Sequence, residues 1–271
     1  MADWPKIVQE CVQEMKKAAQ KYYGAPEKAI SFNIGAGGDR SKKIDLAAEK
    51  ALIDCLNKHE VSCTLVSEEA GTKKIGKEPS EYYVVTDPVD GTTNAVHGLP
   101  FCAHVVAVAD GSYLKNVEIA IVSDIVHDIT YTAQKNKGAF KNGRPIKPSK
   151  VKNIQDAVIG IDLNTIKIED FLPKLKGLFS SGKHFRHFGA NAQEICYVAD
   201  GSTDAFVDIR GKLRVTDMVA SYLILRESGG TILTPEGSEL NVPLEATQRV
   251  SFVCAANNEL YKSVMEALNS K

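Results

Sequence analysis

The sequence predicts an α/β fold, and three features of the 271-residue chain indicate it. Amphipathic helical patterns alternate with short runs of β-branched and aromatic residues, as they do in layered α/β proteins. Hydrophobic residues make up 44% of the chain and charged residues 25%, which is enough apolar material for one large core or two packed domains. Internal repeats and low-complexity segments are absent. An ordinary globular chain is therefore expected.

The first part of the chain has the pattern of two helices followed by strands. Residues 1–24 carry apolar side chains at helical spacing and acids among the bases, which indicates an amphipathic helix and neither a signal nor a transit peptide. Residues 44–56 repeat the helical pattern. Residues 63–69 and 82–85 are rich in β-branched residues, so we expect two buried strands there.

The second part predicts a meander and then alternating elements. Antiparallel strands are expected at residues 101–109, 117–123 and 128–133, followed by a loop over residues 138–150. Beyond this loop, strand and helix patterns alternate as in α/β layering. The expected elements are strands at residues 156–163, 204–209 and 249–256 and helices at residues 191–199 and 217–228.

Charge and cysteine usage exclude several function classes. The formal net charge is -1 and the isoelectric point is about 6.6, which argues against a nucleic-acid-binding protein. No apolar run approaches the roughly twenty residues that a membrane span needs. The six cysteines stand in apolar contexts without a C-x-x-C pair, which indicates reduced core thiols rather than disulfides or a zinc site. We expect a cytoplasmic protein that binds neither nucleic acid nor membrane.

Two aspartates in the stretch VVTDPVDGTTNAVHG, residues 84–98, indicate a metal site. A strand runs into Asp87, and Pro88 is expected to end that strand, so that Asp90 follows within one tight turn. Two carboxylates this close repel each other unless a cation lies between them. Oxygen ligands favour magnesium or manganese over zinc. The alternative is an Asx-rich surface turn that binds nothing.

An anion site is expected beside this metal. Gly91 allows a ligand to approach the backbone closely, and Thr92 or Thr93 can cap a short helix over residues 93–98. Free N–H groups at the start of such a helix bind phosphate. The segment therefore predicts a phosphate held next to a divalent ion.

Three further acids have weaker individual signals. Glu68 follows a strand, but a double Glu in a loop is usually solvated charge. Asp217 begins a helix with Thr216 as its expected N-cap. Asp45 stands one turn into another helix, where an acid by default stabilises the positive helix end. None of these acids would indicate a site if it stood alone.

Four stretches together resemble the inositol monophosphatase family of magnesium-dependent, often lithium-sensitive phosphatases. They match in order and spacing, and the similarity spans nearly the whole chain. The stretches are SEE at 67–69, TDPVDGTTNAVHG at 86–98, GANAQEICYVADGSTDAFVDI at 189–209 and TDMVASYLILRESGG at 216–230. The aspartate motif is shared with fructose-1,6-bisphosphatases and with phosphatases of 3′-phosphoadenosine nucleotides. The resemblance implies a layered αβαβα fold.

The resemblance also implies a set of metal ligands. Glu68, Asp87 and the backbone carbonyl of Val89 would bind a first magnesium ion. Asp87, Asp90 and Asp217 would hold a second ion, and a third, weaker ion would lie near Glu68 through water. Manganese can substitute for magnesium at such oxygen sites.

Catalytic and substrate-binding roles follow from the same resemblance. Thr92, hydrogen-bonded to Asp45, would orient and deprotonate the attacking water next to Glu68. The backbone N–H groups of Gly91 and Thr92, beside Asp90, would receive the phosphate. Asn191 and Asp208 match positions that touch substrate hydroxyls.

Two stretches are similar to archaeal-type enzymes that hydrolyse both fructose 1,6-bisphosphate and inositol 1-phosphate. Asp39 lies on a glycine-rich loop, and we expect it to close over the site and steady the third ion. Arg210 and Lys212 are expected to bind the second phosphate of a bisphosphate, with Arg186 as a further substrate contact. Solvated surface charge is the alternative for each base.

The sequence thus predicts a magnesium-dependent phosphatase of sugar and cyclitol phosphates, by resemblance a homodimer. Residues 1–150 are expected to form a metal- and phosphate-binding domain and residues 151–271 a substrate-side domain. One alternative within the superfamily is a 3′(2′),5′-bisphosphate nucleotidase or NADP phosphatase. An alternative of another class is a non-catalytic phosphosugar-binding protein.

Overall fold

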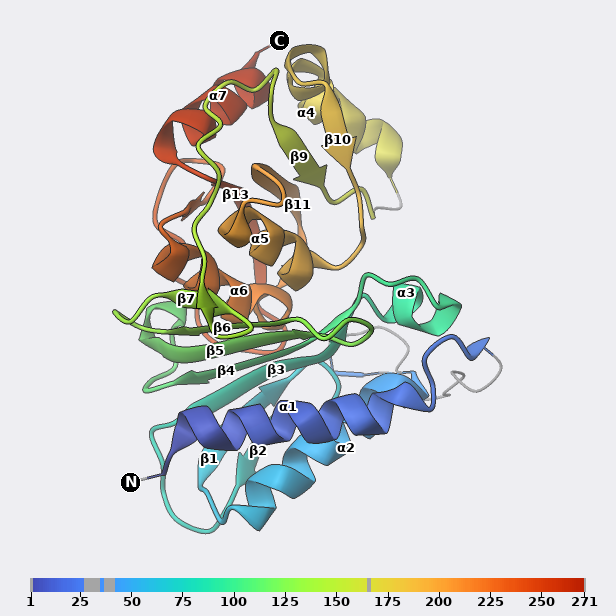
Figure 1. Cartoon of the computed structure of the whole chain (residues 1–271), viewed down its shortest axis with the longest axis vertical. Coiled ribbons are helices and arrows are strands. Elements are labelled where there is room, and N and C mark those ends of the chain that lie inside the picture. Colours follow the sequence, from blue (N-terminus) through green and yellow to red (C-terminus); the bar gives the residue numbers. More distant parts are fainter. Residues whose placement is uncertain (1, 27–34, 37–41, 165–166, 271) are drawn as a thin grey trace.

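The computed structural model describes residues 2–26, 35–36, 42–164 and 167–270. Asp39, which we expected to act in catalysis, lies outside these described residues. The described chain stacks helices and sheets in the order αβαβα (Figure 1). The predicted α/β class and the layered fold implied by the resemblance are therefore confirmed.

The first helical layer consists of α1 (Trp4–Gln20) and α2 (Lys43–Lys58), which cover one face of the larger sheet (Figure 1). Each helix has one apolar face, as the sequence pattern predicted. These faces pack together and against the sheet in one core that includes Val8, Met15 and Leu52.

An eight-stranded sheet forms the second layer. Its strands are β1 (Cys63–Ser67), β2 (Gly71–Ile75), β3 (Tyr83–Asp90), β4 (Ala103–Ala109), β5 (Val117–Asp124), β6 (Thr130–Gln134), β7 (Ala139–Lys141) and β8 (Arg144–Pro145). Their order is β2-β1-β3-β4-β5-β6-β7-β8, and only the β1–β3 pair is parallel. Every residue of β4 is buried, because helices cover both faces of the sheet at this strand.

The central layer consists of α5 (Asn191–Asp200) and α6 (Val215–Ser228), which lie between the two sheets (Figure 1). Most residues of α6 are buried, as expected for a helix that is enclosed on both sides. It belongs to a core that also contains Val105 from the first sheet and Phe252 from the second. A six-residue helix, α3 (Thr92–His97), follows β3.

The second sheet and an outer helix pair complete the fold. The remaining elements are the 3-10 helix η2 (Leu114–Asn116), the strands β9 (Val158–Ile161), β10 (His184–Arg186), β11 (Ala205–Arg214), β12 (Thr231–Leu233) and β13 (Arg249–Ala255), and the helices α4 (Ile168–Ser181) and α7 (Asn258–Asn269). The sheet order is β10-β9-β11-β13-β12. Side chains of α4 and α7 pack on this sheet in a third core, around Leu175 and Val264.

Some elements differ from the sequence expectations. The loop predicted at 138–150 contains the β7–β8 hairpin, whose turn places Asn142 and Gly143 at positive φ. β11 continues to Arg214, past the predicted strand end at residue 209. The predicted boundary near residue 150 falls in the connection between the two sheets, and the division into two domains stays a prediction.

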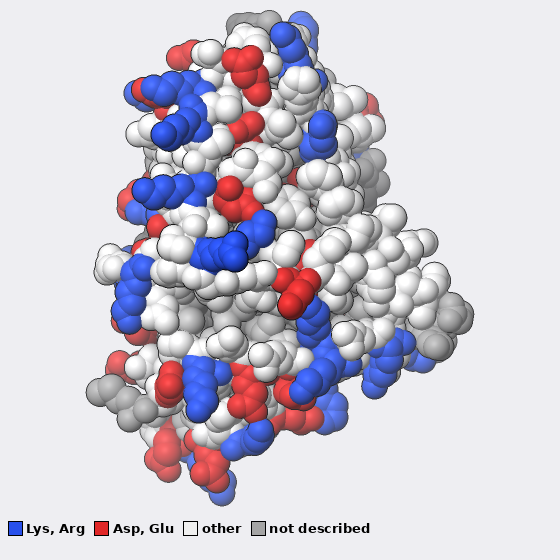
Figure 2. Space-filling view, viewed as in Figure 1, with Lys and Arg blue, Asp and Glu red and all other residues white. Residues whose placement is uncertain are grey.

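The surface agrees with the near-zero net charge. Basic and acidic side chains are interspersed over the face shown in Figure 2, and neither sign forms a continuous stripe there. Within the described ranges, no helix has both the length and the hydropathy that a bilayer crossing needs.

Candidate active site

Asp87 and Asp90 both belong to β3, because this strand continues through Pro88 instead of ending there as predicted. The pairing with β4 shifts register between the two aspartates, and Pro88 lies in this irregular stretch, where its missing N–H breaks no ladder bond. The carbonyl of Pro88 accepts a hydrogen bond of 2.6 Å from Nδ1 of His104. Burial lowers the pKa of His104 to about 4, so the ring that holds this bulge is neutral.

The carboxylate of Asp90 joins β3 to the start of α5. Its Oδ1 accepts a hydrogen bond from the backbone N–H of Asn191 at 2.9 Å. Its Oδ2 accepts from Ala192 at 2.8 Å and from Gln193 at 3.3 Å. A buried acid therefore satisfies the free N–H groups of this helix and fixes it against the sheet.

Asp217 comes from the first turn of α6. The N-cap of this helix is Arg214 and not Thr216, which corrects the sequence expectation. Asp217 Oδ2 accepts a hydrogen bond from the backbone N–H of Arg214 at 3.1 Å, and Oδ1 accepts from the Thr216 hydroxyl at 2.9 Å. These two bonds hold the carboxylate in one orientation at the helix start.

Three acids from separate elements converge in space. Carboxylate oxygens of Glu68, Asp87 and Asp217 lie within 4.8 Å of one another. The guanidinium of Arg214 contacts Glu68 and lies 4.0 Å from Asp217 Oδ1. Asp90 is not part of this close group, although it lines the same pocket. An internal positive charge thus offsets part of the acidic cluster.

Burial and mutual repulsion raise the pKa values of the aspartates. The pKa of Asp87 lies well above its usual range, first through burial and then through repulsion by Asp217 and Asp90. Burial raises the pKa of Asp90 to about 8 and that of Asp45 to about 7, and it also raises the pKa of Asp217. A divalent cation among these oxygens would relieve this electrostatic cost, so the residues fit a hard metal ion.

Thr92 connects Asp45 to the metal-binding segment. The Thr92 hydroxyl lies 2.8 Å from Asp45 Oδ1 and 2.8 Å from the carbonyl oxygen of Val89. A hydroxyl has one proton, so it donates to only one of these oxygens at a time. When Asp45 is protonated, it can donate to Thr92 while Thr92 donates to Val89. When Asp45 is ionised, the hydroxyl proton can turn toward Asp45 and leave the Val89 carbonyl available.

Gly91 is required by its position. It is the N-cap of α3 with a φ of 80°, and Thr92 makes no capping hydrogen bond to this helix, contrary to the prediction of a threonine cap. A Cβ atom at Gly91 would lie 2.6 Å from the carbonyl oxygen of Phe101. The left-handed backbone and the close approach both exclude a side chain.

We expect Gly91→Ala to lower the free energy of unfolding by about 2 to 4 kcal/mol and to reduce turnover, because the strain falls on the segment that carries Asp90 and Thr92. Gly143→Ala is the matched control, since Gly143 has a φ of 74° but no atom within 4 Å of the added Cβ. Denaturant melts of both variants would separate the cost of placing alanine in a left-handed backbone conformation from the cost of the steric clash with Phe101. Equal losses in the two variants would contradict the proposed contact with Phe101.

A pocket of about 730 Å³ opens over this arrangement. Most of the predicted site residues that the structure describes line it. They are Asp45, Glu68, Asp87, Val89, Asp90, Gly91, Thr92, Asn191 and Asp217. The Asn191 side-chain nitrogen donates to Asp162 at 3.0 Å, while its buried side-chain oxygen has no hydrogen-bond partner among the described residues. The predicted metal ligands, the phosphate-binding backbone and one predicted hydroxyl contact, Asn191, therefore share one cavity.

The structure argues against the predicted roles of Asp208 and Arg210 at this cavity. The Arg210 guanidinium binds Asp208 at 2.5 Å and Asp162 at 2.6 Å, and its Nη1 donates to the carbonyl of Asn164 at 2.7 Å. Asp208 is fully buried, and neither Asp208 nor Arg210 lines the pocket. Because the guanidinium is already paired with two buried acids, it is not available for a substrate phosphate.

The other two predicted bases also lie outside the pocket lining. Arg186 is an exposed residue of β10, and its Nη1 donates to the carbonyl of Phe185. Lys212 is exposed on β11. The pairing of β11 with β13 shifts register between Asp208 and Leu213, in the stretch that contains Arg210 and Lys212.

Sequence reasoning missed an aromatic wall. Phe101 and Phe188 stack with ring centroids 4.6 Å apart, and both line the pocket. Glu194 on α5 holds the second ring in place, since its Oε1 accepts hydrogen bonds from the backbone N–H groups of Phe188 and Gly189. No local pattern could have paired two phenylalanines this far apart in the chain.

Comparisons with known proteins agree with this geometry. A model of the inositol monophosphatase family matches residues 4–271. The chain is 32% identical to a fructose-1,6-bisphosphatase/inositol-1-monophosphatase of Methanothermobacter thermautotrophicus, over 98% of this chain and 96% of that protein. A crystal structure of an inositol monophosphatase-fructose 1,6 bisphosphatase superposes with a TM-score of 0.85 at 32% identity, over 98% of this chain and 100% of that one.

A further relative combines two activities in its name. The chain is 33% identical to a bifunctional NADP phosphatase/NAD kinase of Methanococcus maripaludis over 97% of its own length, but it spans only 49% of that relative. It therefore matches about half of the longer protein.

The fold and the acidic pocket define a metal-dependent phosphoric monoester hydrolase that acts on small phosphorylated substrates. The chain belongs to the inositol monophosphatase family. The family resemblance inferred from four sequence stretches is thereby confirmed, together with the predicted enzyme class.

Proposed function

We propose that the protein hydrolyses sugar and cyclitol phosphates, fructose 1,6-bisphosphate at C1 and inositol 1-phosphate among them, with magnesium as cofactor. The observation that carries this proposal is the convergence of Glu68, Asp87 and Asp217 beside the Thr92–Asp45 pair in one pocket. The relatives whose names combine both phosphatase activities support the substrate class.

Residues for two magnesium ions are available in the pocket. Glu68, Asp87 and the Val89 carbonyl would hold the first, and Asp87, Asp90 and Asp217 the second. Such ions, when bound, would lower the pKa of a water and neutralise charge on the leaving oxygen. Arg214 contacts Glu68, so this side chain would have to release Glu68 when an ion binds there.

The chain itself supplies the means to orient the nucleophile. Asp45 is 2% exposed and can accept the Thr92 hydroxyl proton once it is ionised. Thr92 then presents its oxygen lone pairs to the pocket and can accept a proton from an attacking water. The backbone N–H groups of Gly91 and Thr92 would hold phosphate oxygens, and the Asn191 carbonyl could accept a substrate hydroxyl.

Thr92→Ala should lower kcat roughly 100-fold and leave KM nearly unchanged, because the hydroxyl acts on the nucleophile rather than on bound substrate. Thr92→Ser is the matched control, since it keeps the hydroxyl and should retain most of the turnover. Steady-state phosphate release at saturating magnesium would measure both constants. An effect confined to KM would contradict this role.

A phosphate-release panel tests the whole proposal. The substrates are fructose 1,6-bisphosphate, inositol 1-phosphate and 3′-phosphoadenosine 5′-phosphate, each with magnesium and with a chelator. Magnesium-dependent turnover of the two sugar-type substrates is expected. Binding without turnover would indicate the non-catalytic phosphosugar-binding alternative, and turnover of the nucleotide alone would overturn the substrate assignment.

NADP is a second candidate substrate, and the aromatic wall favours it specifically. The stacked Phe101 and Phe188 rings could pack against a base of the dinucleotide while the ribose phosphate reaches the acidic cluster. The relative named an NADP phosphatase/NAD kinase supports this candidate. Adding NADP to the panel, with Phe188→Leu as the discriminating variant, would show whether the rings select a dinucleotide.

A homodimer in the cytoplasm completes the proposal. The described cysteines are all free and buried thiols, which fits a reducing compartment. Light scattering of the magnesium-loaded protein would determine the oligomeric state.

A further inference from the structure

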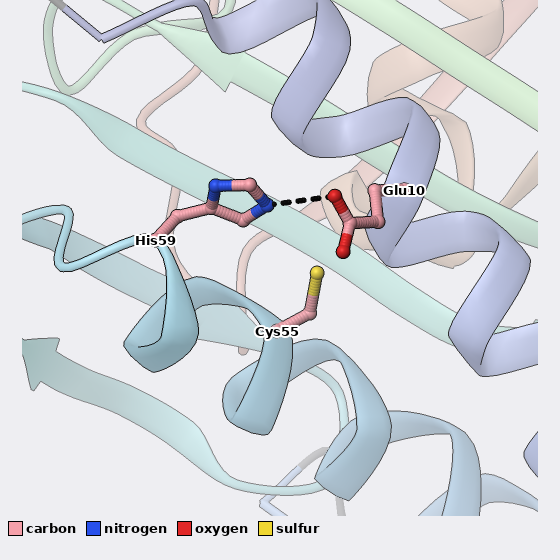
Figure 3. A group of neighbouring side chains, drawn as sticks. All are labelled: Glu10, Cys55 and His59. Carbon is pink, nitrogen blue, oxygen red and sulfur yellow. Dashed lines mark hydrogen bonds and ion pairs between the residues drawn. The ribbon is translucent and has the colours of Figure 1, made fainter.

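A second convergence of metal-ligating side chains lies away from the acidic pocket, between α1 and α2. Ligand atoms of Glu10, Cys55 and His59 lie within 4.8 Å of one another. Figure 3 shows the three side chains pointing into one volume, Glu10 from one helix and the other two from the second. None of the three lines the proposed active-site pocket.

The helical repeat explains why these residues meet. Cys55 and His59 are four residues apart at the end of α2, so both side chains lie on the same helix face. That face packs on α1 through the shared core, and Glu10 lies opposite. Cys55 is 4% exposed, while the side chains of Glu10 and His59 are 30% and 25% exposed. The thiol is thus inside and the other two ligands close the site from outside.

The contacts of Glu10 allow a cation to take the place of the proton between Glu10 and His59. His59 Nε2 lies 3.0 Å from Glu10 Oε2, and Lys58 Nζ lies 2.5 Å from Glu10 Oε1. A cation could replace the His59 proton between the ring and the carboxylate while Lys58 keeps the second oxygen. A cleft of about 510 Å³, lined by Glu10, Cys55 and Lys58, gives solvent and ions access to this point.

The ligand chemistry differs from that of the acidic pocket. A thiolate, an imidazole and a carboxylate form the set that Zn²⁺ prefers, whereas magnesium takes oxygen ligands. We propose that Glu10, Cys55 and His59 form a second, structural metal site that binds Zn²⁺ or a cation of similar softness. The Cys55 S–H bond breaks and its proton passes to solvent, while the proton between His59 Nε2 and Glu10 is given up and the neutral ring keeps one proton, on Nδ1. The thiolate, His59 Nε2 and the Glu10 carboxylate then each donate an electron pair, and water from the cleft fills the fourth position.

The site would fasten α1 to α2 at the far end from the catalytic residues. Asp45 lies in the first turn of α2 and His59 is the C-cap of the same helix. A metal that joins the helices through Glu10 would therefore stabilise the element that positions Asp45. This inference concerns binding and stability and does not depend on the proposed substrate.

Cobalt(II) is the probe that separates the two metal sites. The full-length protein, kept reduced with a phosphine at saturating magnesium, is titrated with Co²⁺. Ligation by Cys55 should produce the intense near-ultraviolet charge-transfer band of thiolate-bound cobalt, and added Zn²⁺ should remove it. Cobalt bound in the all-oxygen pocket produces no such band. The band therefore reports the Cys55 site alone, and the test does not depend on a measurement of activity.

Variants of the ligands make the test decisive. Cys55→Ser should abolish the band, and His59→Gln or Glu10→Gln should weaken cobalt binding at least about 10-fold. Cys63→Ser is the matched control, because Cys63 is also a buried thiol but is outside the cluster. If Cys55→Ser does not fold, the two partly exposed ligands still test the site.

Thermal unfolding supplies an independent measurement. Zn²⁺ added at saturating magnesium should raise the Tm of the wild type and of Cys63→Ser but not that of His59→Gln. The absence of a thiolate band in the wild type would overturn the site and leave an ordinary Glu10–His59–Lys58 ion pair. A band that survives both His59→Gln and Glu10→Gln at unchanged affinity would overturn it as well.

Discussion

Asp87→Asn is expected to reduce kcat/KM by about 1000-fold or more, since Asp87 is the one side chain proposed to contact both ions. The folded chain should tolerate this change. The Asp87 Oδ1 accepts a hydrogen bond from the backbone N–H of Val89 at 3.0 Å, and the amide oxygen of asparagine can accept the same bond. The metal-free variant should be at least as stable as the wild type at pH 8, because one repelling carboxylate is gone.

Two measurements check this prediction. Phosphate release at saturating magnesium reports the loss of activity, and a urea melt in chelator reports the metal-free stability. Asp128→Asn is the control, because the Asp128 side chain is fully exposed and its neutralisation should change neither quantity. Near-wild-type turnover of Asp87→Asn would contradict the proposed ligand set.

Without divalent cation, the free energy of unfolding should fall as the pH rises from about 5 to about 8. The folded-state pKa values of Asp45 and Asp90, about 7 and about 8, exceed the ordinary value of 3.8. The folded state therefore holds protons that the unfolded state releases. The resulting stability is complete below the ordinary pKa and is lost as the pH passes through the folded-state values. From these two groups we expect a loss on the order of 6 kcal/mol.

Magnesium should flatten this pH dependence, because bound ions take the place of the protons among the carboxylates. Some pH dependence of the free energy of unfolding should remain with magnesium bound, because burial also raises the pKa of Glu194 to about 8 and Glu194 is not one of the proposed metal ligands. Glu194→Gln should remove this remaining pH dependence, and magnesium should still flatten the part that comes from the aspartates. Urea melts at pH 5, 6.5 and 8, with magnesium or chelator, would test both points. A metal-free stability that increases toward pH 8 would contradict the assignment of protonated carboxylates.

Local sequence patterns predicted most of the strands and helices, but not the outer helices α4 and α7. Apolar residues recur at helical spacing in α1 and α2, and β-branched runs mark β3 and β4, so burial of these faces decides the element type. Asp87 and Asp90 are three residues apart at the end of one strand, so the sequence could place both at one pocket, although the close acidic group contains Asp87 without Asp90. Short-range chemistry of this kind depends on neighbours along the chain and can be predicted from sequence.

The element ends were predicted less well. Pro88 was expected to end a strand, but β3 absorbs it in an irregular pairing with β4, where no N–H is needed. Thr92 and Thr216 were expected as N-caps, but their hydroxyls bind Val89, Asp45 and Asp217 instead. A hydroxyl can hydrogen-bond to any polar atom close to it, and in the folded protein many of these atoms belong to residues that are distant in the sequence.

The sequence by itself determined the α/β layering, the family and the acids that can hold metal. Only the tertiary structure decided which charged residues serve the pocket. Arg210 is committed to Asp162 and Asp208, and Arg214 lies against Glu68. The Phe101–Phe188 wall and the Glu10–Cys55–His59 cluster were likewise invisible in the sequence. The physical reason is that ion pairs, ring stacks and metal sites require atoms within a few ångströms, and only folding brings distant parts of the chain that close.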